Sequence, residues 1–235
     1  MKKFFILAIL TLPFAFAACT REENNSNGNK KPSYTAVAGE AVDLGLSVKW
    51  SSTNLGAISS TDFGDFFAWG ETAPKDIYTF ETYKLCKGSK STLTRYNNNS
   101  NYGTVDNKTE FKDYDYEDDA ARQALGGKWR IPTESEWIEL WDGCNWSIKE
   151  KYNGTKINGC LLTSKINGAS IFLPAAGRRK DTEYALMYDD GFYWSSSLDT
   201  DEPSNAKYFG FTTVEPSQEK RQRSYGYSVR PVCEY

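Results

Sequence analysis

The sequence predicts an α+β fold with two helices, short antiparallel strands and long loops. Three observations lead to this class. Aromatic residues make up 15% of the 235 residues, a composition that suits short strands. Three Asn-Gly pairs begin at Asn153, Asn158 and Asn167, and such pairs favour tight hairpin turns. Only two segments carry persuasive helix signals, so strands and loops should account for most of the chain.

The N-terminal segment is typical of a secretory signal rather than of a folded element. Lys2 and Lys3 precede an apolar run, residues 4–16, and two alanines then lead to Cys19. This order resembles a bacterial lipobox, in which the cysteine receives lipid. We therefore expect residues 1–18 to be a signal peptide and Cys19 to be lipidated. The alternative is an ordinary cleaved signal that happens to end beside a cysteine.

Residues 19–40 should comprise the lipidated cysteine and a flexible tether, because the stretch after Cys19 is polar and lacks apolar periodicity. The folded domain should span residues 41–235. Within the tether, Arg21-Glu22-Glu23 resembles the acidic tag that sends lipoproteins of Bacteroidota-type bacteria to the cell surface. The predicted location is the outer membrane, with the domain lipid-anchored and facing the exterior, although these charges could simply solvate the linker.

Composition narrows the function classes. The chain contains no histidine, which removes the commonest general base and the usual zinc ligands. Without residues 1–18 its 26 basic residues face 31 acidic ones, so a nucleic-acid partner is not expected. The remaining cysteines allow three disulfide connectivities, and no spacing among them resembles a zinc site. We expect no cofactor. These cysteines are Cys86, Cys144, Cys160 and Cys233.

The strand candidates alternate with turn signals along the chain. Two of them, KINGCLLTSKI and SIFLPAAG, lie between and after the Asn-Gly pairs and should form hairpins. In chain order the candidates are residues 42–50, 63–69, 156–166, 170–177, 192–196, 206–213 and 227–233.

The first predicted helix covers residues 116–125. It starts with acidic residues, which suit a helix N-terminus, and it stops at Gly126-Gly127. The acidic residues around its start could also offer oxygen ligands to calcium. A solvated cap explains them at least as well, so we predict no metal site. They are Asp113, Asp115, Glu117, Asp118 and Asp119.

The second predicted helix begins at Thr133, which forms a capping box with Glu136. Its apolar residues then recur at helical spacing, so one stripe should face the core. We interpret its tryptophans as buried framework rather than as a ligand platform. The stripe consists of Trp137, Leu140, Trp141 and Cys144.

Six motifs in order, VDLGLSVKW, GDFFAWGE, GGKWRIPTESEW, SIFLPAAG, YWSSS and SVRPV, resemble the Fibrobacter succinogenes major paralogous domain family. The resemblance covers residues 41–235 and implies a C-type-lectin-like fold. In that fold the two chain ends pair in a sheet, and long loops on the opposite side present the ligand surface. Glu202-Pro203-Ser204-Asn205 is similar to the calcium-binding and sugar-binding loop of such lectins, but it is one residue too long.

The segment RIPTESEW also resembles a box of formylglycine-generating enzymes, which share this fold. Their chemistry depends on a cysteine pair in the C-terminal part. Here Cys160 falls in a predicted hairpin and Cys233 lies near the chain end, so no matching pair is found. Both are better explained as structural thiols or disulfide partners. We therefore expect the chain not to be an enzyme.

The resemblance places the ligand surface within residues 194–229. Alternation along residues 206–213 puts Phe209 and Phe211 on one face, which we assign to the core. We expect an unidentified glycan or protein ligand. The alternatives are a structural surface or pilus-associated subunit and, less favoured, a formylglycine-type or carboxylate-pair enzyme. The candidate contact residues, expected to face solvent, are Asp199, Asp201, Asn205, Tyr208, Arg221, Arg223, Tyr225 and Tyr227.

Overall fold

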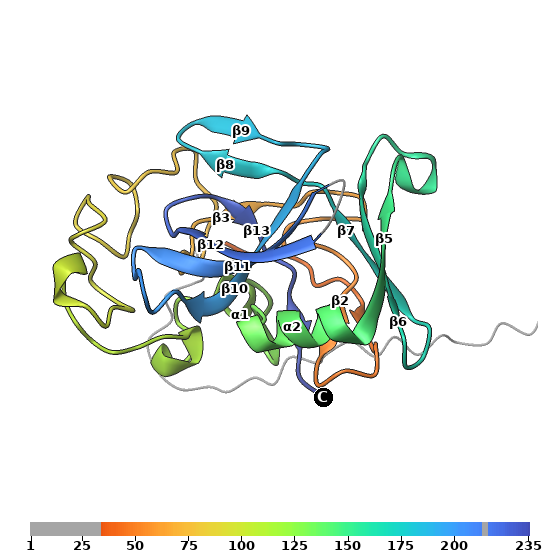
Figure 1. The fold of residues 1–235 in the computed structure, drawn as a ribbon, viewed down its shortest axis with the longest axis horizontal. Helices are drawn as coiled ribbons and strands as arrows, with labels where there is room; N and C mark the ends of the chain where they lie inside the picture. Colours follow the sequence, from red (N-terminus) through yellow and green to blue (C-terminus); the bar gives the residue numbers. More distant parts are fainter. Residues whose placement is uncertain (1–33, 213–215) are drawn as a thin grey trace, which may run out of the picture.

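The computed structural model describes residues 34–212 and 216–235, and it has an α+β architecture (Figure 1). The strands form four sheets in which antiparallel pairing predominates. Cys19 and the predicted signal peptide lie outside the described residues. Within the described residues no helix is long and apolar enough to cross a membrane.

The two ends of the domain meet in a four-stranded sheet of order β1-β2-β14-β4. Val232 lies between Trp50 on one side and Arg130 on the other. The predicted strand 42–50 is two short strands instead, because the chain turns where the Gly45 N–H donates to the Asp43 carboxylate at 2.7 Å. The strands are β1 (Ala41–Val42), β2 (Lys49–Ser51), β4 (Trp129–Arg130) and β14 (Val232–Cys233).

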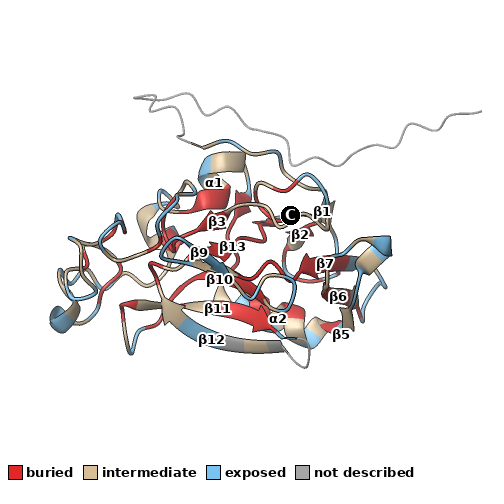
Figure 2. Ribbon diagram, turned by 90° about the horizontal axis from the view of Figure 1, so that it is seen from above, coloured by how far each residue is buried: buried red, intermediate tan, exposed pale blue. Residues whose placement is uncertain are grey.

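A five-stranded sheet of order β12-β11-β10-β13-β3 forms the centre of the domain. Strand β10 is buried along its whole length, β11 is buried from Tyr208 to Phe211, and β12 lies at the outer edge (Figure 2). Alternation along β11 sends Tyr208 into one core cluster and Phe209 and Phe211 into the other. The strands are β3 (Phe66–Phe67), β10 (Gly191–Leu198), β11 (Asn205–Phe211), β12 (Pro216–Gln222) and β13 (Tyr227–Ser228).

The predicted strands 156–166 and 170–177 correspond to β6 and β7, which form a three-stranded sheet with β5. Strand β5 was not predicted, and it begins at Cys144, which the sequence had placed on the second helix. Asn153 and Gly154 have φ of 50° and 75° in the β5–β6 connection, and Gly168 has φ of 75° between β6 and β7. Asn158-Gly159 makes no turn, because Gly159 already belongs to β6. A small hairpin of β8 and β9 was not predicted. The strands are β5 (Cys144–Lys149), β6 (Gly159–Ser164), β7 (Ser170–Pro174), β8 (Arg178–Lys180) and β9 (Glu183–Ala185).

The predicted capping box is present at the start of helix α2 (Glu134–Gly143). The Thr133 side chain accepts a hydrogen bond from the Glu136 backbone N–H, and the Glu136 side chain accepts one from the Thr133 backbone N–H. Trp137 is 1% exposed, and its ring stacks on Phe209 with centroids 4.8 Å apart. The helix therefore packs on the central sheet, and the interpretation of Trp137 as framework is confirmed.

Helix α1 (Ala120–Leu125) is shorter than the predicted 116–125. Asp115 and Tyr116 have φ of 50° and 58°, a left-handed backbone that a helix cannot contain, so the helix starts after them. Asp119 caps it by accepting the Arg122 N–H. The described part of the chain also contains three short 3-10 helices: η1 (Ser100–Tyr102), η2 (Phe111–Tyr114) and η3 (Tyr152–Gly154).

Residues 70–118, here called the long loop segment, contain η1, η2 and isolated bridges but no α-helix or extended strand. They form the side of the molecule away from the β5–β7 sheet (yellow to light green in Figure 1). Such a segment needs side-chain contacts to hold one conformation, because it lacks a hydrogen-bonded ladder.

Arg230, from the SVRPV motif, is a framework residue. Its side chain is 0% exposed, and it donates to Asn54 Oδ1 (2.9 Å) and to the carbonyls of Ser51 (2.9 Å) and Phe172 (2.8 Å). Burial lowers the pKa of Arg230 to about 10, so the guanidinium stays protonated at neutral pH. These hydrogen bonds link β7 to the end of β2 and the residues that follow it.

Candidate functional site

The eight predicted contact residues do not share one solvent-facing surface. Asp201 is exposed, and Asn205, Arg221 and Tyr225 are half-buried. The expectation of exposure is wrong for the other four, whose exposed fractions are 4% or less. They are Asp199, Tyr208, Arg223 and Tyr227.

Tyr208 and Tyr227 are buried because the central sheet has a core on each face. The Tyr227 ring stacks on Trp194 with centroids 4.3 Å apart, and it meets Tyr208 edge-on at 5.0 Å. The Tyr208 hydroxyl donates to Glu219 Oε2 at 2.9 Å. The alternation correctly placed Phe209 and Phe211 together, but the opposite face is a second core rather than a display surface.

Arg223 is a buried clamp between the end of β12 and the long loop segment. Its guanidinium donates to the carbonyls of Arg95 (3.1 and 3.2 Å), Tyr96 (3.0 Å) and Pro203 (3.1 Å) and to the Tyr83 hydroxyl (3.0 Å). It also lies 4.9 Å from the Trp69 ring centroid. A guanidinium can be buried in this way because carbonyl oxygens and a ring face replace its hydration.

The Asp199 carboxylate is buried where β10 turns toward β11, 3.1 Å from Lys220 Nζ. The hydrogen bond with Asp199 raises the pKa of Lys220. In the same turn, Asn205 Nδ2 donates to Glu202 Oε2 at 3.0 Å, and the Ser204 hydroxyl donates to Glu202 Oε1. The Glu-Pro-Ser-Asn sequence is therefore an internally hydrogen-bonded turn.

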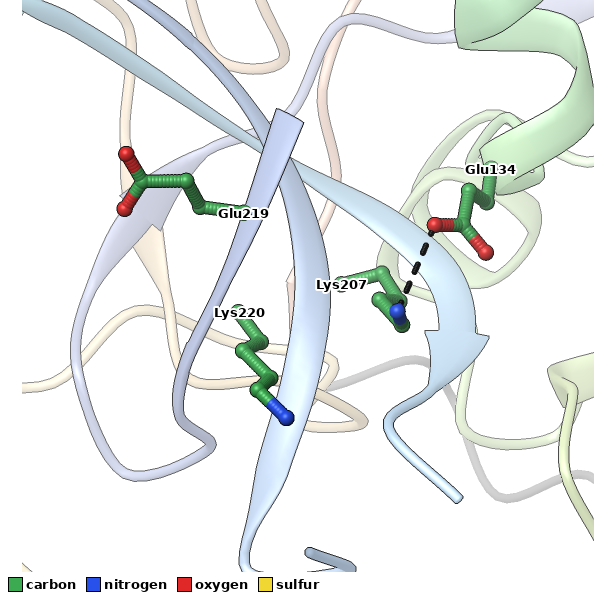
Figure 3. A pocket seen from close by; sticks show the side chains of 4 residues that line it. All are labelled: Glu134, Lys207, Glu219 and Lys220. Atoms are coloured by element: carbon green, nitrogen blue, oxygen red, sulfur yellow. Dashed lines mark ion pairs between the residues drawn. The ribbon is translucent and has the colours of Figure 1, made fainter. Parts of the chain in front are cut away.

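A shallow depression of about 330 Å³, here called the charged depression, lies between β11, β12 and the start of α2. Lys207 and Lys220 are opposite one another in the β11–β12 register. Like charges in this arrangement repel, and the Lys207 ammonium lies 3.5 Å from Glu134 (Figure 3). Glu219, the fourth lining residue, extends to the other side of β12 (Figure 3).

The charged depression can bind a polar ligand. Two ammonium groups can donate hydrogen bonds to a ligand, and the Glu134 carboxylate can accept them. Sequence reasoning missed Lys207, Lys220 and Glu134. The antiparallel register of two neighbouring strands would have paired the lysines, but Glu134 comes from a helix far away in the sequence.

Arg178 and Arg221 lie beside aromatic side chains on the face of the central sheet that is opposite the charged depression. The Arg178 guanidinium carbon is 5.6 Å from the Phe192 ring centroid and 5.8 Å from that of Tyr225. Arg221 lies next to the hydroxyls of Tyr208 and Tyr227. Two of the eight predicted contact residues therefore remain partly accessible on this face: Tyr225 offers an aromatic ring and Arg221 a cationic group.

Four of the five acidic residues near η2 and α1 have structural partners: Asp113, Glu117, Asp118 and Asp119. Asp113 accepts the N–H groups of Thr109 and Glu110, and Asp118 binds Arg95 at 2.8 Å. Burial raises the pKa of Asp119 to about 6, although N–H groups donate to both of its oxygens. Across residues 34–212 and 216–235, no group of three or more His, Cys, Asp or Glu residues is arranged to hold a metal ion.

Cys86, Cys144 and Cys160 are free thiols, so none of the two-bridge pairings open to the four domain cysteines is formed. Burial raises the pKa of the Cys144 thiol to about 11 and that of Cys160 to about 12. Both remain protonated at neutral pH and pack in the core between α2 and the β5–β7 sheet.

Comparison of the chain with protein families, curated proteins and solved structures finds no match. The family resemblance therefore rests on the six sequence motifs.

Proposed function

We propose that this protein is a cell-surface lipoprotein whose C-type-lectin-like domain recognises a glycan or protein ligand. The C-type-lectin-like assignment is supported by the order of the six motifs and by the pairing of β2 with β14, which brings the chain ends together. Two helices and a long irregular segment are also consistent with that fold.

The observation that carries the proposal is the Arg223 clamp. A buried guanidinium fixes the Arg95 and Tyr96 carbonyls of the irregular long loop segment to the sheet, and it also holds the Pro203 carbonyl in the turn between Asp201 and Asn205. A binding surface that is already fixed loses little conformational entropy when the ligand binds. An irregular segment held in one conformation by buried polar groups therefore suits a recognition protein.

The ligand surface in this proposal is smaller than the sequence predicted. It consists of the charged depression with Asp201 and Asn205, which belong to the neighbouring β10–β11 turn and the start of β11. Lysine and asparagine side chains provide hydrogen-bond donors there. Arg221 and Tyr225 are also accessible but lie on the opposite face of the central sheet, so they do not belong to this surface.

The thiols disfavour the formylglycine-type alternative. Reactive cysteines are thiolates in electropositive, accessible surroundings. Cys144 and Cys160 are buried, with the pKa of each raised by burial. Neither suits a reactive nucleophile without rearrangement of the core.

Surface anchoring rests on the sequence signals and is tested separately. Cys19→Ala should abolish incorporation of labelled fatty acid and release the protein from the membrane fraction. In intact cells the wild-type domain should be cleaved by added protease. Complete protection of the domain in intact cells, with cleavage after lysis, would show that it faces inward.

Ligand recognition can be tested with glycan arrays and immobilised host extracellular proteins. The double variant Lys207→Gln/Lys220→Gln should weaken binding at least about tenfold, the effect of losing roughly 1.4 kcal/mol. The matched control is Lys151→Gln/Lys156→Gln, which removes two exposed charges from the β5–β6 connection. Equal loss in both double variants would exclude the charged depression, and absence of any wild-type binding would count against recognition.

A further inference from the structure

Large side chains are exposed together on the β8–β9 hairpin and the residues that follow it. Tyr184 is 57% exposed, Leu186 42% and Tyr188 48%. Single exposed apolar residues are common on protein surfaces, but a group of them commonly marks a binding site. In Figure 1 the hairpin lies on the side of the molecule away from the C-terminus. Its first residue, Arg178, is on the face opposite the charged depression, so this surface is separate from it.

The Tyr184 ring is held in place although the residue is mostly exposed. Arg179 is its partner in the β8–β9 register, and the guanidinium carbon lies 4.4 Å from the Tyr184 ring centroid. This guanidinium is itself fixed, because it donates to three backbone carbonyls at 2.8 to 3.2 Å. Phe66 meets the Tyr184 ring at a steep angle, with centroids 5.7 Å apart. Tyr184 therefore offers an accessible aromatic surface that does not need to be ordered by a ligand.

Tyr188 provides a second exposed ring beside the same segment of the chain. It packs edge-on against Phe63 with centroids 5.3 Å apart, and Phe63 is three residues from Phe66. The Tyr188 N–H donates to the Ala175 carbonyl at 2.8 Å, and its carbonyl accepts from Asn158 Nδ2 at 2.9 Å. These bonds hold Tyr188 at φ of 72°, a left-handed backbone that is unfavourable for a bulky residue. Such strain is typical of positions where a side chain is held for binding.

The charged side chains around the two rings favour an uncharged ligand that carries hydroxyl groups. Carboxylates accept hydrogen bonds from hydroxyl groups and repel anions. Charged residues alternate with the exposed rings, whereas the core of a protein–protein interface is depleted of charge, so a protein partner fits less well. Within residues 180–189 the exposed charged residues are Lys180, Asp181, Glu183 and Asp189.

We propose that Tyr184 and Tyr188 bind a neutral oligosaccharide, each ring stacking on the C–H face of one sugar residue. The face of an aromatic ring is negative, so it attracts the C–H groups of a sugar. The hydroxyl groups of the sugar can then donate to the flanking carboxylates. The inference rests on the proposed recognition function and assigns to it a site separate from the charged depression.

The test is a titration of the mature chain, residues 20–235, with neutral trisaccharides and tetrasaccharides of glucose, mannose and N-acetylglucosamine. Chemical shifts of backbone amides report where each one binds. We expect at least one to bind with a Kd on the order of 1 mM, with shifts centred on residues 63–66 and 179–189. Tyr184→Ala and Tyr188→Ala should each weaken this binding at least about tenfold.

The matched control is Tyr235→Ala, which should leave the affinity unchanged. Tyr235 is 55% exposed and also has a cation over its ring, since Lys49 Nζ lies 4.8 Å from the ring centroid. It differs from Tyr184 in that no other aromatic ring of the described residues packs against it. The control therefore separates the proposed site from a general effect of removing an exposed tyrosine.

The inference is overturned if no neutral oligosaccharide shifts the amides near the two tyrosines, or if either tyrosine variant binds as tightly as the wild type. It is also overturned if Tyr235→Ala weakens binding equally. Because the wild-type shift map does not depend on a variant, the test survives a variant that fails to fold. Oligosaccharide binding at Lys207 and Lys220 alone would support the proposed recognition function while refuting this second site. Loss of an extracellular protein ligand in Tyr184→Ala, with no saccharide bound by the wild type, would refute the saccharide and identify a protein interface.

Discussion

Replacing Arg223 tests whether the long loop segment is held by a buried guanidinium. Arg223→Met keeps an unbranched side chain but removes the charge and every hydrogen bond that the guanidinium donates. The backbone carbonyls of Arg95, Tyr96 and Pro203 then lose their donor in a buried place. At about 1 kcal/mol for each carbonyl, the free energy of unfolding should fall by about 3 kcal/mol.

This loss is a large part of the total, because domains of this kind are stable by roughly 5 to 15 kcal/mol. Urea unfolding followed by tryptophan fluorescence measures the free energy. Hydrogen exchange of peptides covering residues 93–98 measures the local effect, and their amides should lose protection before the central sheet does.

The control for this experiment is Arg221→Met, which alters a half-buried arginine two residues earlier on β12. We expect it to cost less than about 1 kcal/mol, as is usual for substitutions away from the core. The reasoning is refuted if Arg223→Met and Arg221→Met destabilise the protein equally and neither changes exchange in residues 93–98.

Three further outcomes follow from the same structure. Trp137→Ala should lower the free energy of unfolding by roughly 3 to 5 kcal/mol in urea titrations, since it deletes a buried indole; a loss near zero would contradict the framework role. Burial would raise the pKa of Glu136, but Arg130 and the cap outweigh it, so the pKa falls below its ordinary 4.5. The stability that Glu136 contributes is therefore present above pH 4.5 and is lost as the pH falls through its folded pKa. In urea titrations the difference in unfolding free energy between wild type and Glu136→Gln should shrink over that acidic range. A constant difference from pH 7 to pH 3 would refute this role of Glu136. Cys144 and Cys160 should react with a disulfide reagent at neutral pH only after unfolding in urea, and fast reaction of the native protein would show that they are accessible.

The sequence predicted α2 correctly because its signals are local. Thr133 and Glu136 are three residues apart, and Trp137 and Leu140 share one face of the helix. The same holds for the hairpin at Gly168, where the turn residue and both strands lie within a few positions. Such features need no knowledge of distant parts of the chain.

The contact residues were misjudged because their partners are distant in sequence. Arg223 was expected to face solvent because the family resemblance places the ligand surface within residues 194–229, and charged side chains are rarely buried unless they are paired. The carbonyls that pair with it belong to Arg95 and Tyr96, more than a hundred residues earlier. Tyr208 was misjudged for a related reason, since alternation distinguishes two faces of a strand but does not show that both are covered.

The pairing of β2 with β14 has a consequence for the order of synthesis. Trp50 is made early, but its partner Val232 comes 182 residues later (232 − 50). The sheet that joins them therefore cannot close until Val232 has been translated. Contacts so far apart in sequence also slow folding. In a nascent chain this sheet therefore stays open while the residues between its two partner strands are synthesised.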